Sequence, residues 1–196
     1  MWKALILFIP LFLLFAQPGD VTDNILKIGD SAPHFQGTDQ HGELIDSEKI
    51  TAEKPLVLIF YRGVWCPHCI KHLTRLQDSL SMLQDAGVRV VLVANEQPKF
   101  IGQTIEKTGA EFSIISDSDY SIMKNYKVAF KIDHETVPNY YDYVLENTRR
   151  VSGTEEDILP VPATFIIDTD NKIHWIHFDT DYSVRAKVAE ILKNLP

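Results

Sequence analysis

The sequence predicts one α/β domain with a central mixed, mostly parallel β-sheet flanked by helices. Three observations predict this fold class. Apolar runs of strand length alternate with segments of helical periodicity, the last part of the chain has the pattern of a hairpin followed by a helix, and no repeat or low-complexity tract interrupts the series. The length of 196 residues, 45% of them hydrophobic and 23% charged, suits a single compact domain.

Residues 1–16 have the pattern of a signal peptide. Lys3 is a short positive region, residues 4–15 are apolar, and Ala16 is a small residue before polar chain. The apolar run contains Pro10 and is shorter than the roughly 20 residues of a spanning helix, so cleavage is favoured over retention as an anchor. We expect an exported protein, periplasmic or secreted, with no stable membrane span after processing and with tethering only if the segment is kept. Residues 17–25 form a linker and residues 26–196 the folded domain.

The first elements of the domain follow in chain order. The stretch from the linker to about residue 50 has short apolar runs broken by glycines, as in a hairpin-forming entry region. Leu56–Phe60 is continuously apolar, which is typical of a strand buried on both faces. From Pro67 to Leu83 leucines recur at helical spacing, and Gly87 ends this single helix. Val88–Ala94 is the next buried strand.

The remaining elements continue the alternation. They are a helix over Lys99–Lys107 ending near Gly109, a strand over Phe112–Ile115, a helix over Asp119–Tyr126, a strand over Ala163–Asp168, a turn at Asn171, its antiparallel partner over Lys172–Phe178, and a closing helix over Ser183–Leu195. Between Phe130 and Pro160 lies a tyrosine-rich insert that is too long for a plain connection. We interpret it as a surface elaboration that packs Tyr140, Tyr141 and Tyr143 on the core, in preference to a substrate lid.

The only two cysteines of the chain, Cys66 and Cys69, stand close together in the stretch FYRGVWCPHC. A structural disulfide is disfavoured, because the stabilisation from a disulfide grows with the logarithm of the loop it closes and this loop is very short. A zinc or copper site is the second reading, with His72 as third donor and His68 as fourth. Structural zinc sites usually add a second ligand pair, and no other cysteines exist. The distant donors are candidates only if folding brings them close: His134, His174 and His177.

The position of the pair favours redox chemistry. A buried strand ends shortly before it, and Pro67 suits a first helical turn, where a missing N–H costs nothing. Cys66 is therefore expected near the helix N-cap and Cys69 within the first turn. Free N–H groups and the helix dipole stabilise a thiolate there. Arg62 and His68 can add to this stabilisation, and two thiols on one turn can close a disulfide.

Three stretches carry a resemblance: FYRGVWCPHC, LPVPATFIIDTDNKIHW and HFDTDYSVRAKVAEIL. They are similar to the peroxiredoxin-like branch of the AhpC/TSA (alkyl hydroperoxide reductase / thiol-specific antioxidant) family, in the thioredoxin-fold superfamily. The similarity runs from about Leu26 to Leu195. It implies a thioredoxin-like fold with a peroxiredoxin-type N-terminal extension and a long insert before the strand that follows Pro162. It also implies an antioxidant oxidoreductase that works without a cofactor.

The resemblance implies, first, an alignment of the peroxiredoxin motif with this chain. Typical peroxiredoxins carry Pro-x-x-x-Thr-x-x-Cys at this helix and an arginine before the later strand. The peroxidatic cysteine falls on Cys69 and the threonine on Cys66, while the proline falls on Arg62 and the arginine at or near Pro162. In the family the hydroxyl and guanidinium orient the peroxide and stabilise its developing charge. Only the cysteine of that set is present, which disfavours efficient peroxide reduction.

The thioredoxin pattern matches the pair more closely. Trp65, Cys66 and Cys69 match its Trp-Cys-x-x-Cys, and Pro162 matches its cis-proline, so the Val161–Pro162 bond is predicted to be cis. On this pattern the more exposed Cys66 attacks and Cys69 resolves.

Two further features bear on this pattern. The residues between the cysteines, Pro67 and His68, are those of strongly oxidising bacterial disulfide oxidants, which indicates an oxidising potential. Thioredoxins also keep a buried carboxylate in the strand before the pair, and Leu56–Phe60 has none.

We therefore expect a thiol-based oxidoreductase that cycles Cys66 and Cys69 between dithiol and disulfide. The supporting residues are Arg62, Trp65, Pro67, His68 and Pro162. Thiol–disulfide exchange with protein thiols or disulfides is favoured over hydroperoxide reduction by the same pair, and a thioredoxin-like or other thiol protein is the redox partner. The alternatives are an exported metal-binding module and a recognition domain without catalysis. The net charge of −8, without runs of like charge, gives no reason to expect nucleic acid.

Overall fold

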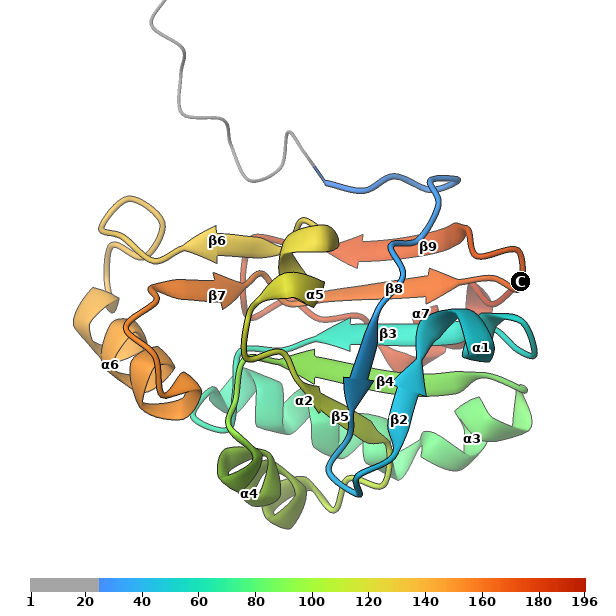
Figure 1. Ribbon diagram of the computed structural model, residues 1–196, viewed down its shortest axis with the longest axis horizontal. Helices are drawn as coiled ribbons and strands as arrows, with labels where there is room; N and C mark the ends of the chain where they lie inside the picture. The colour runs from blue at the N-terminus through green and yellow to red at the C-terminus, as the bar shows by residue number, and fades with distance from the viewer. Residues whose placement is uncertain (1–24) are drawn as a thin grey trace, which may run out of the picture.

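The computed structural model describes residues 25–196 (Figure 1). The predicted signal peptide and nearly all of the predicted linker lie outside the described residues. None of the helices in the described part of the chain is long and apolar enough to cross a membrane.

A mixed sheet of five strands in the order β5-β4-β3-β8-β9 forms the centre of the fold. The middle strand β3 (Leu56–Phe60) is parallel to β4 (Arg89–Ala94), which is parallel to β5 (Ser113–Ser116). On its other side β3 pairs antiparallel with β8 (Ala163–Ile167), and β8 pairs antiparallel with β9 (Ile173–Phe178). Every residue of β3 and β8 is buried, as expected for strands covered on both faces. The predicted α/β class with a mixed sheet is confirmed.

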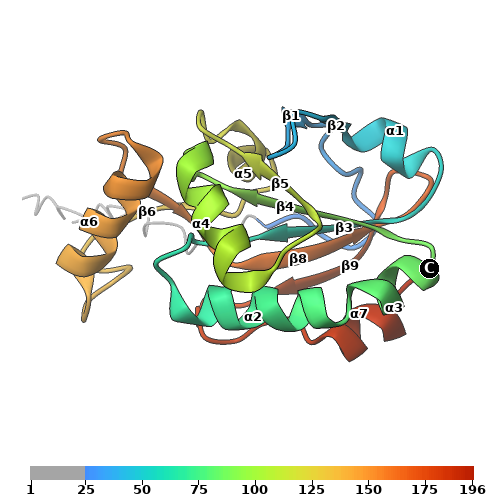
Figure 2. The same cartoon turned by 90° about the horizontal axis from the view of Figure 1, so that it is seen from below.

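Helices cover both faces of the sheet (Figure 2). One face carries α2 (Pro67–Asp78), α3 (Leu80–Asp85), α4 (Pro98–Thr108) and α7 (Val188–Lys193). The other carries α1 (Ser47–Thr51), α5 (Ser121–Asn125) and the hairpin of β1 (Gln36–Thr38) and β2 (Leu44–Asp46). Two apolar clusters, one on each face, form the core.

Most predicted boundaries agree with the structure to within about two residues. Gly109 follows α4 with φ of 67°, the left-handed conformation that ends a helix. Asn171 has φ of 57° in the turn between β8 and β9, as predicted.

The predicted single helix from Pro67 onward is wrong in one respect. It is interrupted at Ser79, whose φ of −115° and ψ of 11° separate α2 from α3. Asp78 and Ser79 are both weak helix formers, because their short polar side chains compete for backbone hydrogen bonds. Leu80 and Leu83 nevertheless stay buried, so the apolar face continues across the break.

The closing helix is shorter than predicted. It covers only Val188–Lys193, and the chain from residue 179 to 187 is not helical. The Asp181 carboxylate accepts hydrogen bonds from the backbone N–H and the hydroxyl of Ser183, at 2.9 and 2.7 Å. These local turn contacts compete with helix formation. The non-helical segment 179–187 instead passes beside the start of α2.

The insert before β8 has secondary structure of its own. Strand β6 (Ala129–Lys131) pairs antiparallel with β7 (Ile158–Pro160), and α6 (Tyr141–Ser152) lies between them, beyond one end of the sheet (Figure 1). Tyr140 is 61% exposed and Tyr143 52% exposed. The predicted packing of these tyrosines on the core is therefore wrong for both, because the buried face of α6 consists of other residues, namely Val144, Thr148, Val151 and Ser152.

The predicted cis bond before Pro162 is also wrong, since residues 25–196 contain no cis peptide bond. Only two residues connect β7 to β8, and the backbone N–H of Val161 donates to the carbonyl of Val128 at 2.8 Å. A residue before proline favours extended backbone, and the trans form of such a bond is more stable by about 0.5–1 kcal/mol. The first strand of the insert, β6, and the residue before it thus hold the chain that leads to Pro162 extended, and β8 follows with a trans bond.

Candidate active site

The cysteine pair lies at the start of α2, where the chain leaves the buried strand β3. Cys66 is the N-cap residue with φ of −89° and ψ of 109°, and Pro67 occupies the first helical turn. The backbone N–H of Cys66 donates to the carbonyl of Gly63 at 3.1 Å, which closes the turn before the helix. Cys69 is the third residue of the helix. The predicted placement of both cysteines is confirmed.

Both thiols are free and neither is accessible from bulk solvent. Cys66 is 1% exposed and Cys69 is not exposed at all. Cys66 lines a pocket, whereas Cys69 does not and belongs to the apolar core beneath it. Cys66 is thus the pocket-facing thiol, and the two differ little in exposure.

The pocket has a volume of about 410 Å³. It is lined by every supporting residue predicted from the sequence, namely Arg62, Trp65, Pro67, His68 and Pro162. These residues come from the loop after β3, the start of α2 and the start of β8, so the fold brings together segments about 100 residues apart in the chain. All of them line the same pocket as Cys66.

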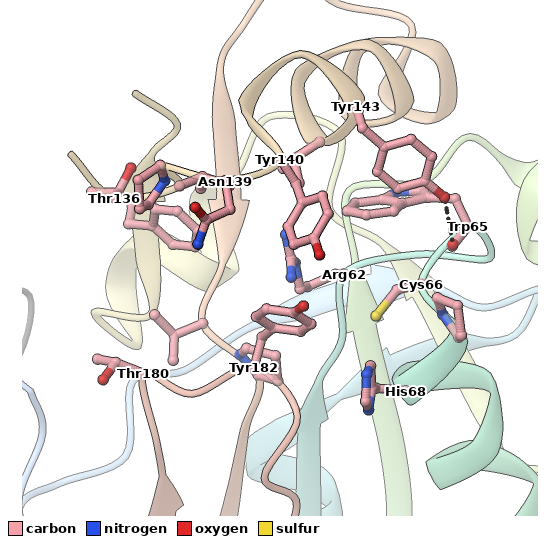
Figure 3. Close-up of a pocket in the computed structure, with 17 residues that line it drawn as sticks. Arg62, Trp65, Cys66, His68, Thr136, Asn139, Tyr140, Tyr143, Thr180 and Tyr182 are labelled. Atoms are coloured by element: carbon pink, nitrogen blue, oxygen red, sulfur yellow. Dashed lines mark hydrogen bonds between the residues drawn. The ribbon is translucent and has the colours of Figure 1, made fainter. Parts of the chain in front are cut away.

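The insert forms one wall of this pocket, which the sequence interpretation did not anticipate. Figure 3 shows Tyr140 and Tyr143 reaching toward the loop that carries Arg62 and Trp65. The Tyr143 ring meets the Trp65 ring edge to face with centroids 5.9 Å apart, and its hydroxyl donates to the Trp65 carbonyl at 3.5 Å. The exposure of the two tyrosines is explained by this position, because they face the pocket rather than the core.

Arg62 is a buried cation beside Cys66. It is 4% exposed, and its guanidinium lies over the rings of Trp65 and Tyr182, 5.0 and 4.8 Å from their centroids. Its Nε has no hydrogen-bond partner, and none of the ion pairs among residues 25–196 includes it. Burial lowers the pKa of Arg62, and the two cysteine sulfurs oppose that effect. A guanidinium in this state has N–H groups available for oxygen atoms that enter the pocket.

The two cysteines share one proton. The Cys66 S–H donates a hydrogen bond to the Cys69 sulfur, and this contact together with burial raises the pKa of Cys66. Burial alone would raise the pKa of Cys69 as well, but the hydrogen bond from Cys66 and the charge of Arg185 lower it to about 6. Of the two thiols, Cys69 therefore has the lower pKa and ionises first, with Cys66 as its donor.

Arg185 is a site residue that the sequence did not reveal. Its Nη2 lies 3.6 Å from the Cys69 sulfur, and its Nη1 donates to the Val184 carbonyl at 2.7 Å. It comes from segment 179–187, which also supplies Tyr182 to the pocket. An arginine in the first turn of the expected closing helix over Ser183–Leu195 has the pattern of a solvated surface residue, so no sequence signal pointed to it.

A buried carboxylate also lies beside the site, although β3 contains none. The Glu96 side chain, at the end of β4, is not exposed and accepts hydrogen bonds from the Val64 N–H at 2.7 Å and the Tyr61 hydroxyl at 2.8 Å. A third comes from the Thr104 hydroxyl at 3.2 Å. Burial raises the pKa of Glu96. The signal that could have found it is a charged residue two positions after the apolar run of β4.

Gly63 allows the Glu96 carboxylate to pack against the loop that follows β3. Its φ is +130°, and a Cβ there would lie 2.9 Å from Trp65 Nε1 and 3.1 Å from Glu96 Oε1. Only glycine adopts this backbone conformation at no cost, and only glycine leaves room for both groups.

The donors of the predicted metal alternative are not gathered. No group of three or more histidine, cysteine, aspartate or glutamate side chains within residues 25–196 is arranged to hold a metal ion. His72 Nε2 donates to the Ala186 carbonyl at 3.0 Å, His68 meets the Tyr182 ring, and His134 stacks on Tyr141. These three histidines are thus engaged in other contacts.

Comparisons with known proteins agree with this geometry. The profile of the AhpC/TSA family matches residues 28–176. The chain is 27% identical over 156 residues to peroxiredoxin Bcp of Escherichia coli strain K12, covering 80% of this chain and 88% of that protein. It is 29% identical over 118 residues to the chloroplastic peroxiredoxin Q of Populus jackii, covering 60% of this chain and 54% of that protein.

Solved structures extend the comparison to the fold. Peroxidoxin BcpB from Mycobacterium tuberculosis has a TM-score of 0.64 at 19% identity, covering 86% of this chain and 96% of that one. A peroxiredoxin-like protein from Aquifex aeolicus gives the same TM-score and identity, covering 87% and 86%. At this level of identity the likeness shows the fold, and it confirms the predicted thioredoxin-like architecture.

Proposed function

Because the chain belongs to the AhpC/TSA family and is a peroxiredoxin-like oxidoreductase, we propose that it reduces hydroperoxides with Cys69 as the attacking thiolate and Cys66 as the resolving thiol. One observation carries the proposal. The Cys69 sulfur, whose pKa is lowered to about 6, is hydrogen-bonded to Cys66, and Cys66 lines a pocket together with the buried guanidinium of Arg62, which forms no ion pair with a carboxylate among residues 25–196.

The reaction has two steps on the protein. The Cys69 thiolate attacks one oxygen of the hydroperoxide, so that an S–O bond forms and the O–O bond breaks. Sulfur loses two electrons to the peroxide and becomes a sulfenic acid, while the leaving alkoxide takes up a proton and departs as an alcohol. Cys66 then attacks the Cys69 sulfur and releases water, which leaves a disulfide that an external dithiol reduces to complete the cycle.

Arg62 acts on the substrate side of this reaction. Negative charge develops on the leaving oxygen as the O–O bond breaks, and a preorganised cation in a water-poor site stabilises that charge. The guanidinium is held by two aromatic rings and lines the pocket, so little reorganisation is needed when an oxygen arrives. This supplies from the loop after β3 a group that typical peroxiredoxins place before β8.

Cys66 has a second role before it resolves. It occupies the position of the threonine in the peroxiredoxin pattern, and its S–H donates to the Cys69 thiolate as that hydroxyl would. The absence of the threonine therefore does not leave the thiolate without a donor. The same side chain then supplies the second sulfur of the disulfide.

The pocket supports an organic hydroperoxide as substrate. Its walls include apolar and aromatic side chains from the insert and from the start of β8, among them Val137, Pro138, Tyr140, Val144 and Val161. A cavity of about 410 Å³ accommodates a carbon skeleton beside the O–O group. Apolar surface buried there contributes binding free energy that hydrogen peroxide lacks.

Thiol–disulfide exchange as the main activity stays a prediction. The cis-proline that supported it is absent from residues 25–196. Exchange is still needed to regenerate the dithiol, so a thioredoxin-like or other thiol reductant is proposed as the partner. Export directed by residues 1–16 is likewise a proposal, tested by the N-terminal sequence of protein recovered from outside the cytosol.

The test compares the two activities on the same reduced protein. Purified protein is mixed with one equivalent of cumene hydroperoxide, and loss of the peroxide is followed with formation of the Cys66–Cys69 disulfide by intact mass. The proposal predicts one disulfide for each peroxide consumed, faster than disulfide formation from an oxidised protein substrate at the same concentration. Faster oxidation by the protein disulfide, with the peroxide left unconsumed, would instead favour exchange.

A further inference from the structure

Segment 179–187 meets α2 at two points beside the cysteine pair. Arg185 Nη2 lies 3.6 Å from the Cys69 sulfur, and the carbonyl of the next residue, Ala186, accepts a hydrogen bond from His72 Nε2 at 3.0 Å. Cys69 and His72 are three residues apart on the helix and so lie on the same face. Both are buried, as is Ala186. The backbone and the side chain of the segment are thus both fixed relative to the reactive sulfur.

The guanidinium of Arg185 has two recorded acceptors. Nη1 donates to the Val184 carbonyl at 2.7 Å, which orients the planar group, and Nη2 faces Cys69. None of the ion pairs within the described part of the chain includes Arg185. The Cys69 sulfur is therefore the one recorded acceptor of this cation that can carry a full negative charge. An opposite charge at this distance favours the ionised form of a titratable group.

We propose that Arg185 is the residue that holds Cys69 as a thiolate, positioned by the hydrogen bond from His72 to the Ala186 carbonyl. Arg185 stabilises the Cys69 thiolate, whereas Arg62 stabilises the charge on the leaving oxygen of the substrate. The chain thus has no arginine at or near Pro162 but brings one to the same sulfur from the segment that precedes α7.

Other charged and titratable groups surround Cys69, and among them Arg185 is the cation whose side chain donates a hydrogen bond to its sulfur. They are Tyr61 and Arg62 after β3, Cys66 and His72 on α2, Glu96 after β4, and His177 on β9. Burial lowers the pKa of both His72 and His177, so neither adds positive charge at neutral pH. Glu96 opposes the thiolate. Arg62 faces the pocket and gives Cys69 a backbone hydrogen bond, whereas Arg185 gives it a side-chain one.

The test titrates one thiol. In the Cys66→Ser chain Cys69 is the only cysteine, so the ultraviolet absorbance of the thiolate as a function of pH belongs to it alone. Adding Arg185→Met is expected to move the midpoint upward by roughly 1 to 3 pH units, because the nearest opposite charge is removed. Arg75→Met is the matched control: it removes an exposed cation from the same helix and is expected to leave the midpoint in place.

Two further variants keep the proposal testable if Arg185→Met does not fold. Arg185→Lys keeps a positive charge and is expected to give a midpoint between those of arginine and methionine. His72→Leu removes the positioning hydrogen bond without changing the net charge at neutral pH, and its midpoint is expected to rise by less than that of Arg185→Met. Equal midpoints for Arg185→Met and Arg75→Met, together with no effect of His72→Leu, would overturn the proposal.

The inference rests on the proposed function only for its consequence in turnover, because the titration uses no substrate. With peroxide, Arg185→Met is expected to lower the rate constant about tenfold or more at pH 7 and to recover toward the parent rate at high pH. A shifted titration without any reaction with peroxide would uphold the role of Arg185 and contradict the hydroperoxide reductase. An unshifted titration with fast peroxide reduction would contradict the role of Arg185 and uphold the hydroperoxide reductase.

Discussion

The hydroxyl of Tyr61 donates a hydrogen bond of 2.8 Å to the carboxylate of Glu96, and both side chains are buried. Tyr61 belongs to the same apolar cluster as Cys66 and Cys69. Burial, and to a smaller extent the negative charge of Cys69, raise the pKa of Glu96; the charge interaction is mutual, so an ionised Glu96 disfavours the Cys69 thiolate. The ionisation of Cys69 is thus opposed by one buried carboxylate and favoured by two guanidinium groups.

Glu96→Gln is expected to lower the midpoint of Cys69 ionisation. The change removes a like charge while keeping a side chain of the same size, so the thiolate becomes easier to form, by on the order of 1 pH unit. The measurement is the absorbance titration of the Cys66→Ser chain with and without Glu96→Gln. Glu106→Gln, at an exposed position of α4, is the control. A midpoint that rises in Glu96→Gln would mean that the carboxylate supports the thiolate through the loop instead.

His72 makes the fold sensitive to mild acid. Burial first, and then the charge of Arg185, lower the pKa of His72 to about 4 from 6.5. Between these two values the unfolded chain binds a proton that the folded chain does not. Stability is therefore full above pH 6.5 and is lost as the pH falls toward 4, by up to about 3 kcal/mol in the free energy of unfolding.

Urea denaturation at a series of pH values measures this effect. His72→Gln is expected to flatten the decrease in the free energy of unfolding between pH 6.5 and 4. His174→Gln, at an exposed position of β9, is expected to keep it. If the decrease persists unchanged in His72→Gln, the acid sensitivity comes from other groups.

Arg62→Lys is expected to slow the reaction with peroxide even where Cys69 is fully ionised. Lysine keeps the charge but cannot present two N–H groups in a plane to the leaving oxygen or stack between two rings. We expect a decrease of about 100-fold in the second-order rate constant at high pH. Arg150→Lys, at an exposed position of α6, serves as the control. Recovery of the parent rate at high pH would assign Arg62 to the thiolate rather than to the substrate.

Tyr140→Ala is expected to change the choice of substrate. Tyr140 lines the pocket from the insert and adds apolar contact for a bulky peroxide but not for hydrogen peroxide. The ratio of rate constants for cumene hydroperoxide and hydrogen peroxide should fall roughly tenfold, which corresponds to the loss of a partly buried aromatic contact. The control is Leu44→Ala, an exposed apolar residue on β2. An unchanged ratio would contradict the role of the insert as a pocket wall.

The fold was largely predictable from the sequence because its central strands are apolar on both faces. Leu56–Phe60 and Val88–Ala94 can only be buried strands, and the leucines after Pro67 can only pack one face of a helix. The break at Ser79 was not predictable from this apolar spacing, since the leucines keep their period across it. The trans bond before Pro162 depends on the pairing of the insert, which no local pattern indicates.

The candidate site was predictable only in part, for a related reason. Cys66, Cys69 and the residues between them are adjacent in sequence, so local spacing places them at a helix N-terminus. Arg185 and Glu96 reach the pair from segments that become neighbours only in the folded sheet. The low pKa of Cys69 depends on the Cys66 S–H and on Arg185, whereas the prediction that Cys66 attacks first came from the thioredoxin pattern, which includes no such arginine.

The measurement that tests the account most directly is the reaction of each single-cysteine variant with hydroperoxide, followed by stopped flow and by trapping of the sulfenic acid with dimedone. The account predicts that Cys66→Ser, whose serine hydroxyl replaces the S–H donor, forms a sulfenic acid on Cys69 at a rate near that of the unchanged protein. It predicts that Cys69→Ser reacts roughly 100-fold more slowly, because the thiol of Cys66 is protonated at neutral pH. Fast sulfenic acid formation on Cys66 in Cys69→Ser, with an inert Cys66→Ser, would contradict the account and make the pocket-facing thiol the nucleophile.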